Sequence, residues 1–437
     1  MKNFFRKYYQ PAVSLLWALL VLCLPFTSSP IVAKLMGGTM VAVPSGIILF
    51  IFLIIWMLPR LWKGVEIPRH TLPLFLFLLI ALISVVVGYW RDIPAFKGVN
   101  PLKENIEAII TLIMGICFYL AALLWLKKGE SEKKIKQTLR LISYAGMFIF
   151  VKAFAEVLLW RSMGMYPDWF YSIHRLFVTG PLFDNRIAAF TYEPSWLANQ
   201  LNLLFLPYWL ASTVTRFSAF EKKIWKLQVE DICLVLGAAT LFFTLSRLGY
   251  VSFLLMLGIL FIRGTIWLTT WIQNKLQQKN SRLKEKTPQL LLRIGIYAVV
   301  VLVYLGLILG AGFALRSLDY RNEEIFNIQL EDFDLKGYAE DLAFGARLSY
   351  WLGGWNVFNK YPFLGAGLGN AGFHFADTLP NSAWKLIEVR QLFYRSSGVL
   401  NIKSLGFRLL AETGILGFSA FLCFLPVSYT HLTLPTN

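Results

Sequence analysis

The residues best suited to chemistry are arginines that lie where apolar helices are predicted to end. Arg247, in the segment TLSRLGY, falls between two long apolar runs with almost no gap, so it should mark a sharp break between two helices. An arginine at the centre of a membrane span costs about 2.5–3.5 kcal/mol, and less near the interface. Arg247 is therefore either a cation available to an anionic ligand or a side chain that reaches the interface from a helix end.

A second arginine precedes a run of glycines. Arg347 and Trp351 are four residues apart, so both side chains lie on one face of a short helix that should end before Pro362. Glycines without side chains let backbone N–H groups approach an anion closely. The glycines predicted to bind an anion in this way are Gly365, Gly367 and Gly369.

A carboxylate is predicted near the start of another apolar helix. Glu193 is followed by a proline, which is favourable in the first turn of a helix, and Arg186 lies seven residues earlier. Glu193 either stabilises the positive end of the helix dipole or acts as a general base that faces the arginines. Lys152 and Glu156, four residues apart in an apolar run, are best explained as a structural ion pair.

The sequence contains none of the motifs that bind nucleotides or metal ions. It has no P-loop, no glycine-rich turn before a helix and no HExxH or paired-cysteine pattern. The four cysteines lie inside apolar runs, and the four histidines are scattered. We therefore expect no metal ion and no cofactor.

The composition identifies the chain as an integral membrane protein. Of the 437 residues, 57% are hydrophobic and only 15% are charged, whereas soluble domains average about 25% charged residues. The net charge is +17, which in a soluble protein would favour nucleic acid as a partner. Here the basic residues gather in alternate connections between apolar runs, so the charge reports topology and we expect no nucleic acid as a partner.

Ten apolar runs are long enough to cross a bilayer as helices. We therefore predict an all-α polytopic membrane protein with about ten transmembrane helices in this chain, 10–12 in a complete protein, and a large ordered helical outer loop. The predicted spans are 11–28, 41–58, 71–89, 104–126, 139–160, 192–214, 229–246, 248–272, 294–315 and 406–426.

The basic connections define the cytoplasmic side, so the N-terminus should be cytoplasmic. Helices 1–9 then occupy 1–315, with an outer loop at about 161–191. The long aromatic-rich connection 316–405 should be an ordered cap outside the membrane, followed by the tenth span at 406–426. Pro426 should end that span, and the unpatterned stretch 427–437 resembles the read-through of a truncated fragment.

Three stretches resemble the bacterial O-antigen ligase and polysaccharide polymerase family. TLSRLGY is similar to that family's Ser-Arg at an outer helix break, and the segment from Arg347 to Gly369 is similar to its long outer loop. LLAETGILGF, from Leu409 to Phe418, is similar to the start of the helix after that loop. The EPS element at Glu193 is similar to one found in capsule and exopolysaccharide polymerases.

The resemblance implies a metal-independent, inverting glycosyltransferase whose donor is a glycan on a polyprenyl diphosphate. Arg247 and Arg347 would stabilise the negative charge that develops on the leaving diphosphate, with Arg186 close by. Ligases usually supply a histidine before the LLAE motif, but Lys403 and Ser404 stand there in this chain.

The acceptor hydroxyl requires a base, for which Glu193 is the first candidate and His374 the second. The resemblance therefore assigns catalysis to Glu193, Arg247 and Arg347. The substrate-binding candidates are Arg186, Arg247, Arg347, Gly365, Gly367, Gly369 and His374.

The function predicted from these features is a repeat-unit polymerase for O-antigen, capsule or exopolysaccharide in the bacterial cytoplasmic membrane, with its active site on the periplasmic or extracellular face. Its partners would be the lipid-linked oligosaccharide, the bilayer and a chain-length regulator. The close alternative is an O-antigen ligase that transfers the glycan to lipid A-core.

A flippase for lipid-linked oligosaccharides and a nonenzymatic membrane scaffold are the alternatives from other classes. A transporter should carry repeated halves and charged residues near the bilayer midplane, whereas the arginines here lie at predicted outer helix ends. The organised outer cap is not expected of a scaffold.

Overall fold

The computed structural model describes residues 2–36, 41–126, 131–220, 225–279, 289–316, 345–395 and 398–433. Every regular element in these ranges is a helix, as predicted, and two isolated β-bridges are the other pairings there. The chain is an all-α, polytopic membrane protein.

Each of the ten predicted spans contains a helix or consecutive helices, although the first helix ends at Leu22, before the predicted end at 28. Six helices in the described part of the chain are long and apolar enough to cross a membrane. They are Pro44–Trp62, Arg69–Tyr89, Pro101–Trp125, Glu132–Met163, Arg247–Trp271 and Leu405–Thr430. Tyr8–Leu22 and Tyr297–Gly306 are shorter apolar helices, so the number of ten spans stays a prediction.

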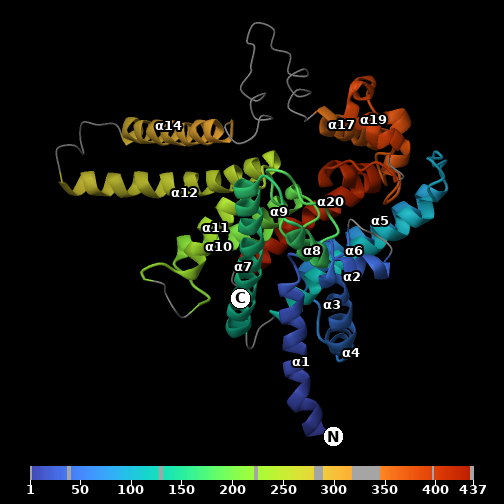
Figure 1. Cartoon of the computed structure of the whole chain (residues 1–437), viewed down its shortest axis with the longest axis horizontal. Coiled ribbons are helices and arrows are strands. Elements are labelled where there is room, and N and C mark those ends of the chain that lie inside the picture. The colour runs from blue at the N-terminus through green and yellow to red at the C-terminus, as the bar shows by residue number, and fades with distance from the viewer. Residues whose placement is uncertain are drawn as a thin grey trace. The chain divides into compact units, whose positions relative to one another are not determined.

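The chain divides into two compact units, each built from two separate stretches of sequence (Figure 1). The first unit comprises 1–59 and 125–317, and the second comprises 60–124 and 318–437. The first contains the predicted residues Arg186, Glu193 and Arg247. The second contains Arg347, His374 and the glycine run.

The first unit is built around a buried tryptophan between two glycines. The Trp209 indole lies so close to α7 and α11 that a β-carbon at Gly146 or Gly237 would come within 2.6 or 2.7 Å of it. Its ring N–H donates to the Ser143 hydroxyl, at 3.2 Å, which satisfies the polar atom of an otherwise apolar core. The helices of this unit are α1 (Lys2–Leu22), α2 (Pro30–Met36), α3 (Pro44–Phe52), η1 (Leu53–Met57), α7 (Ser131–Met163), α8 (Asp168–Phe177), α9 (Pro194–Gln200), η3 (Leu201–Phe205), α10 (Leu206–Thr215), α11 (Val229–Phe243), α12 (Arg247–Lys279) and α14 (Gln289–Arg316), and α4 (Leu58–Trp62) crosses the boundary between the units.

Two π-helical turns interrupt helices just before prolines. The turns η1 and η3 end two residues before Pro59 and Pro207. A proline lacks the backbone N–H and crowds the carbonyl four residues earlier, so the preceding turn widens instead of ending the helix. The second widened turn lies directly after α9, whose first residue follows Glu193.

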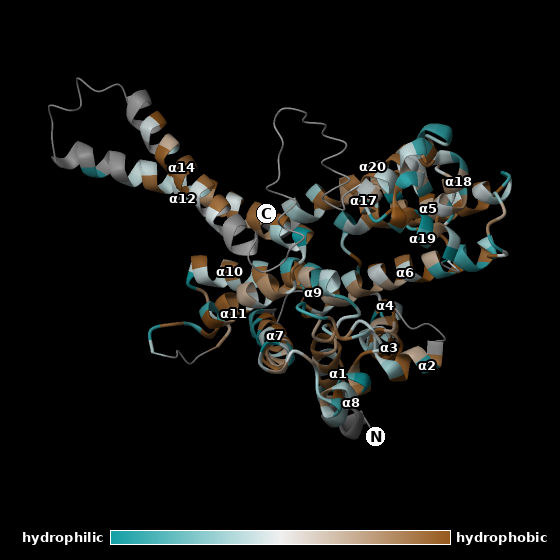
Figure 2. Ribbon diagram, turned by 45° about the horizontal axis from the view of Figure 1, so that its top comes forward, coloured by the Kyte–Doolittle hydropathy of each residue, from teal (hydrophilic) through white to brown (hydrophobic). Residues whose placement is uncertain are grey.

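Helices α12 and α14 lie side by side within the first unit (Figures 1 and 2). The Tyr304 hydroxyl donates to the carbonyl oxygen of Leu254 at 2.8 Å. Figure 2 shows hydrophobic residues around the described parts of both helices. Because lipid is apolar on every side, an exposed apolar helix surface is typical of a membrane-embedded pair.

The second unit contains the described part of the predicted outer cap, with a core of its own. Tyr350, Phe375 and Val389 are fully buried there, and the first two stack with ring centroids 6.1 Å apart. Residues 318–344 of the expected cap lie outside the described residues. The helices of this unit are η2 (Arg69–Thr71), α5 (Leu72–Tyr89), α6 (Pro101–Trp125), α17 (Gly345–Lys360), η6 (Ala371–His374), α18 (Phe375–Thr378), η7 (Asn381–Lys385), α19 (Ile387–Arg395) and α20 (Leu405–Thr433).

Helix α20 has a break at Gly414 that is filled by the loop after α17. Gly414 has φ +64° and ψ −168°, which interrupts the helical hydrogen bonds. The N–H groups of Ile415 and Leu416 donate to the carbonyl oxygens of Pro362 and Phe363, at 2.8 and 3.3 Å. The sequence did not predict this break, because the apolar pattern runs through it unchanged.

The end of α20 also differs from the prediction. Pro426 was expected to end the helix, but α20 continues through it to Thr433. A proline removes its own N–H and crowds the turn before it, whereas the residues that follow can still form helical hydrogen bonds. Residues 434–437 lie outside the described residues.

Candidate active site

The predicted break at Arg247 is present and is stabilised by hydroxyl groups. Helix α11 ends at Phe243, Leu245 adopts φ +48°, and α12 begins at Arg247. The Thr244 hydroxyl accepts the N–H of Ser246, and the Ser246 hydroxyl accepts the N–H of Gly249, each at 3.3 Å. These bonds cap the first turn of α12 and hold half-buried Arg247 at the positive end of that helix.

Arg186 joins the same break from another segment of the chain. Its Nε–H donates to the carbonyl oxygen of Thr244 at 3.2 Å. The next N–H, from Ile187, donates to the carbonyl oxygen of Phe243 at 3.2 Å. Carbonyl groups at a helix C-terminus carry partial negative charge, so a guanidinium is favoured there. The structure thus places Arg186 beside the turn that leads to Arg247.

Glu193 directly precedes α9, which packs on the first turn of α12. Glu193 is extended, with φ −147° and ψ 158°, and its Oε1 accepts the Ser195 hydroxyl at 2.6 Å. A β-carbon at Gly249 would lie 2.7 Å from the Ala198 β-carbon, so the two helices touch close to their N-termini. Two helix N-termini and two arginines in one region favour negative charge there.

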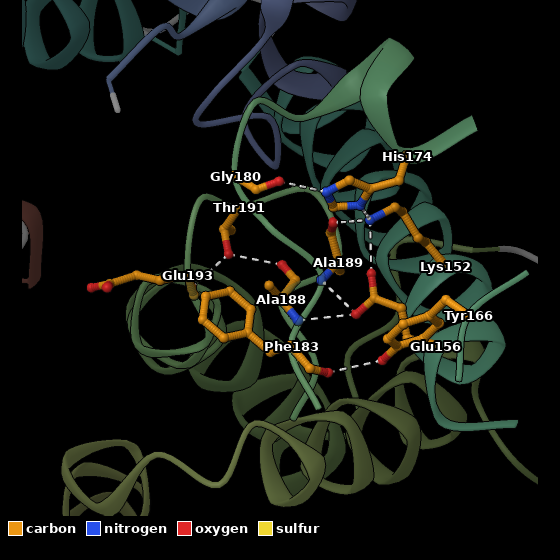
Figure 3. Close-up of polar contacts among 10 residues, drawn as sticks. All are labelled: Lys152, Glu156, Tyr166, His174, Gly180, Phe183, Ala188, Ala189, Thr191 and Glu193. Atoms are coloured by element: carbon orange, nitrogen blue, oxygen red, sulfur yellow. Dashed lines mark hydrogen bonds and ion pairs between the residues drawn. The ribbon is translucent and has the colours of Figure 1, made fainter. Parts of the chain in front are cut away.

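The 187–191 segment, which connects Arg186 to Glu193, is bound to a buried ion pair (Figure 3). Lys152 and Glu156 of α7 are 7% and 1% exposed, and their charged groups are 2.7 Å apart. The predicted structural pair is therefore confirmed. One Glu156 oxygen accepts the N–H groups of both Ala188 and Ala189, at 3.0 and 3.2 Å.

Lys152 has an acceptor for each of its three ammonium hydrogens. It donates to Glu156, to Nδ1 of His174 at 3.0 Å, and to the carbonyl oxygen of Ala189. Ala189 has φ +47°, a conformation that costs an alanine about 1–2 kcal/mol. The hydrogen bonds to the N–H and the carbonyl oxygen of Ala189 offset that cost.

His174 completes this group as a neutral imidazole. Burial, and then the charge of Lys152, lower the pKa of His174 from 6.5 to about 4. Nε2 therefore carries the proton and donates to the carbonyl oxygen of Gly180 at 2.8 Å, while Nδ1 accepts from Lys152. We call Lys152, Glu156 and His174 the Lys152 cluster.

In the second unit, Arg347 lies on α17 with Trp351 one turn later, as predicted. The Trp351 ring stacks on Phe407 of α20, with centroids 5.8 Å apart. Arg347 is half-buried and occupies the face of α17 that carries Trp351. Its role as a ligand of an anion stays a prediction.

The three predicted glycines all have positive φ, and their N–H groups are used within the protein. Gly365 donates to Tyr361 at 3.0 Å and Gly367 to the carbonyl oxygen of Glu412 at 3.1 Å, while Gly369 donates to the Glu412 carboxylate. A β-carbon at Gly369 would lie 2.9 Å from the carbonyl oxygen of Glu104. Close packing on α6 and α20 accounts for these glycines, and their contact with substrate stays a prediction.

His374, the second candidate for the base, is 2% exposed in η6. Its ring lies edge-on to Tyr361 at 5.4 Å. Burial, followed by the charge of Lys360, lowers the pKa of His374 to about 4. An imidazole with this pKa is a weak base, and its burial limits contact with an acceptor.

Sequence reasoning missed what the Lys152 cluster binds. The signal was present, because two opposite charges one helical turn apart interrupt an apolar span and must be satisfied inside the protein. Among the described residues, no group of three or more His, Cys, Asp or Glu side chains could hold a metal ion.

Residues 232–422 match a family model described as O-antigen ligase. The match begins in α11, includes Arg247 and Arg347, and ends within α20. Neither a curated protein nor a solved structure matches the chain.

Proposed function

We propose that the chain, whose residues 232–422 match the O-antigen ligase family model, is a polysaccharide repeat-unit polymerase. The family indicates a glycosyltransferase of the O-antigen ligase and polymerase type that acts on lipid-linked glycans in a membrane. The proposed reaction joins one polyprenyl-diphosphate-linked glycan to the end of another, by an inverting and metal-independent displacement. The observation that carries the proposal is that Arg186 binds the turn before Arg247, while α9, which begins directly after Glu193, packs on the first turn of α12.

In the proposed reaction, Glu193 acts as the general base. The acceptor hydroxyl forms a bond to the anomeric carbon of the donor sugar while the bond from that carbon to the diphosphate oxygen breaks. The hydroxyl proton passes to the Glu193 carboxylate, which already accepts a hydrogen bond from Ser195. A single displacement inverts the anomeric carbon.

The leaving diphosphate gains negative charge, and the arginines would stabilise it. Arg247 and Arg186 contribute guanidinium groups at the α11–α12 break, and Arg347 on α17 is the proposed further ligand. Because a diphosphate leaves readily, this scheme needs no general acid. We place the reaction on the periplasmic or extracellular face of the cytoplasmic membrane, opposite the basic connections.

A polymerase is preferred to a ligase because of Lys403. This residue stands about where the related ligases carry a histidine. Its ammonium is 2.9 Å from Glu388 and lies over the Tyr350 ring, 5.2 Å from the centroid. An ion-paired ammonium is a poor base, so the function of that histidine is absent at this position. The family description itself favours the alternative, an O-antigen ligase.

Reconstitution separates the two reactions. The purified protein is placed in liposomes with lipid-linked repeat units as the only substrate, and products are resolved by length on a gel. A polymerase gives a ladder without any other acceptor, whereas a ligase gives product only when lipid A-core is added. No product under either condition, with protein that is correctly inserted, would contradict the proposal.

A further inference from the structure

The Lys152 cluster is a deeply buried group of titratable side chains in the first unit. All three of its members are 7% exposed or less. Its side chains bind the chain segment between Arg186 and Glu193. In Figure 3 the Glu193 side chain points away from the cluster. Any effect of the cluster on Glu193 must therefore pass through the backbone of the segment.

We propose that Lys152 and Glu156 are positioning residues for glycosyl transfer. They hold the 187–191 segment in place, so that Arg186 before the segment and Glu193 after it face the substrate. This inference rests on the function proposed above. It assigns a task to a buried ion pair that touches neither donor nor acceptor.

Glu156 and Lys152 bind the segment through the N–H and the carbonyl oxygen of one residue, Ala189. Glu156 accepts two consecutive N–H groups with one oxygen, a geometry in which backbone amides form a small anion-binding nest. Lys152 donates to the carbonyl oxygen of Ala189. Because Ala189 has positive φ, the chain turns there in a direction that alanine does not take without such support.

The Thr191 hydroxyl connects the bound segment to the backbone of Glu193. The Thr191 hydroxyl lies 2.8 Å from the carbonyl oxygen of Ala188 and 2.9 Å from that of Glu193. Ala188 is itself bound to Glu156. Three hydrogen-bond contacts, Glu156 to Ala188, Ala188 to Thr191 and Thr191 to Glu193, therefore connect the buried carboxylate to the backbone of Glu193.

The other end of the segment is fixed in a similar way. Ile187 donates to Phe243 in the turn before Arg247, while Asn185, with φ +57°, accepts the indole N–H of Trp160 in α7. Helix α7 thus supports both flanks of the segment, and movement of the segment would displace Arg186 from Thr244.

The test compares two variants of one helix. In Glu156→Gln, the amide cannot accept from Lys152 and from both backbone N–H groups, since one of its two terminal atoms is a donor. The matched control is Glu132→Gln, which removes an exposed ion pair with Lys136 in the same helix, where the charged groups are 2.8 Å apart. The double variant Lys152→Met, Glu156→Gln avoids leaving an unpaired buried charge and serves if the single variant does not insert.

Two measurements are made on each inserted protein. Hydrogen exchange of the peptide that covers 186–193 should become at least tenfold faster in the cluster variants, while α11 and α12 keep wild-type exchange. Turnover at saturating lipid-linked donor should fall at least tenfold, with a smaller change in KM, because Glu193 acts in the chemical step. Glu132→Gln should change neither.

If hydrogen exchange at 186–193 is unchanged in the cluster variants, the proposal that Lys152 and Glu156 hold the segment in place is wrong. Faster exchange with wild-type turnover would overturn the link to catalysis. If the wild-type protein transfers no glycan, the proposed function fails, and the exchange measurement still decides whether the cluster holds the segment.

Discussion

Gly365 lies against Glu412 so closely that a β-carbon at position 365 would overlap the carbonyl group of Glu412. The two residues come from different motifs of the sequence, the glycine run and LLAETG. The N–H of Ala366 donates to the carbonyl oxygen of Ala411 at 2.8 Å, beside the overlap. The two motifs therefore occur together because they form one packed structure.

Gly365→Ala should destabilise the second unit. With φ +69°, the left-handed conformation alone costs alanine about 1–2 kcal/mol, and the overlap with Glu412 adds to that cost. The apparent melting temperature in detergent should fall by several degrees. Gly115→Ala in α6, where nothing lies within 4 Å of the added carbon, is the control and should be neutral or stabilising.

Arg247→Ala and Arg347→Ala should each abolish long-chain product without loss of inserted protein. Removing a cation that stabilises a leaving diphosphate should lower turnover by about 10²–10³. Arg→Lys should also fail largely, because lysine lacks the planar pair of donors. The measurement is product length on gels at matched protein levels, and normal lengths in both alanine variants would exclude these residues as ligands.

Glu193→Gln should stop chain extension while single lipid-linked repeat units accumulate. Glutamine keeps the size and the bond to Ser195 but cannot take up the acceptor proton. His374→Ala should retain product, since this imidazole is buried and its pKa is lowered to about 4. The opposite result, wild-type lengths in Glu193→Gln and loss in His374→Ala, would assign the base to His374.

The stability of the protein should fall as the pH drops from about 6.5 to about 4. In this window the unfolded chain binds a proton at His374, whereas burial keeps the pKa of the folded residue near 4, so protonation favours unfolding. His374→Gln should make the decline less steep, as measured by melting temperature against pH. His174 contributes in the same direction and should leave a residual slope.

Cysteine labelling tests the proposed orientation. A cysteine at Ser382, in η7, should react with an impermeant maleimide in spheroplasts, whereas one at Ser131, at the start of α7, should react only after lysis. Both are introduced into a background without the four native cysteines. The reverse pattern would place the arginines on the cytoplasmic side.

Much of the fold follows from the apolar pattern, since runs of this length can satisfy their backbone in lipid only as helices. The break at Arg247, the helix start after Glu193 and the Lys152–Glu156 pair also follow from local sequence. Long-range contacts do not. Arg186 on Thr244 and Glu156 on Ala188 join segments 58 and 32 residues apart, and nothing in the spacing specifies them.

The glycine run shows the limit of motif reasoning. Positive φ at Gly365, Gly367 and Gly369 agrees with the expected backbone freedom. The same freedom serves close helix packing here, and sequence alone does not distinguish packing from anion binding.

The contact between Ser84 and Glu412 has a consequence for synthesis of the protein. The Ser84 hydroxyl of α5 donates to the carbonyl oxygen of Glu412, 328 residues later in the chain. At roughly 5–20 residues per second, the partner leaves the ribosome on the order of tens of seconds after α5. During that interval the Ser84 hydroxyl lacks its final acceptor, so this part of the second unit can form its native contacts only after α20 has been synthesised.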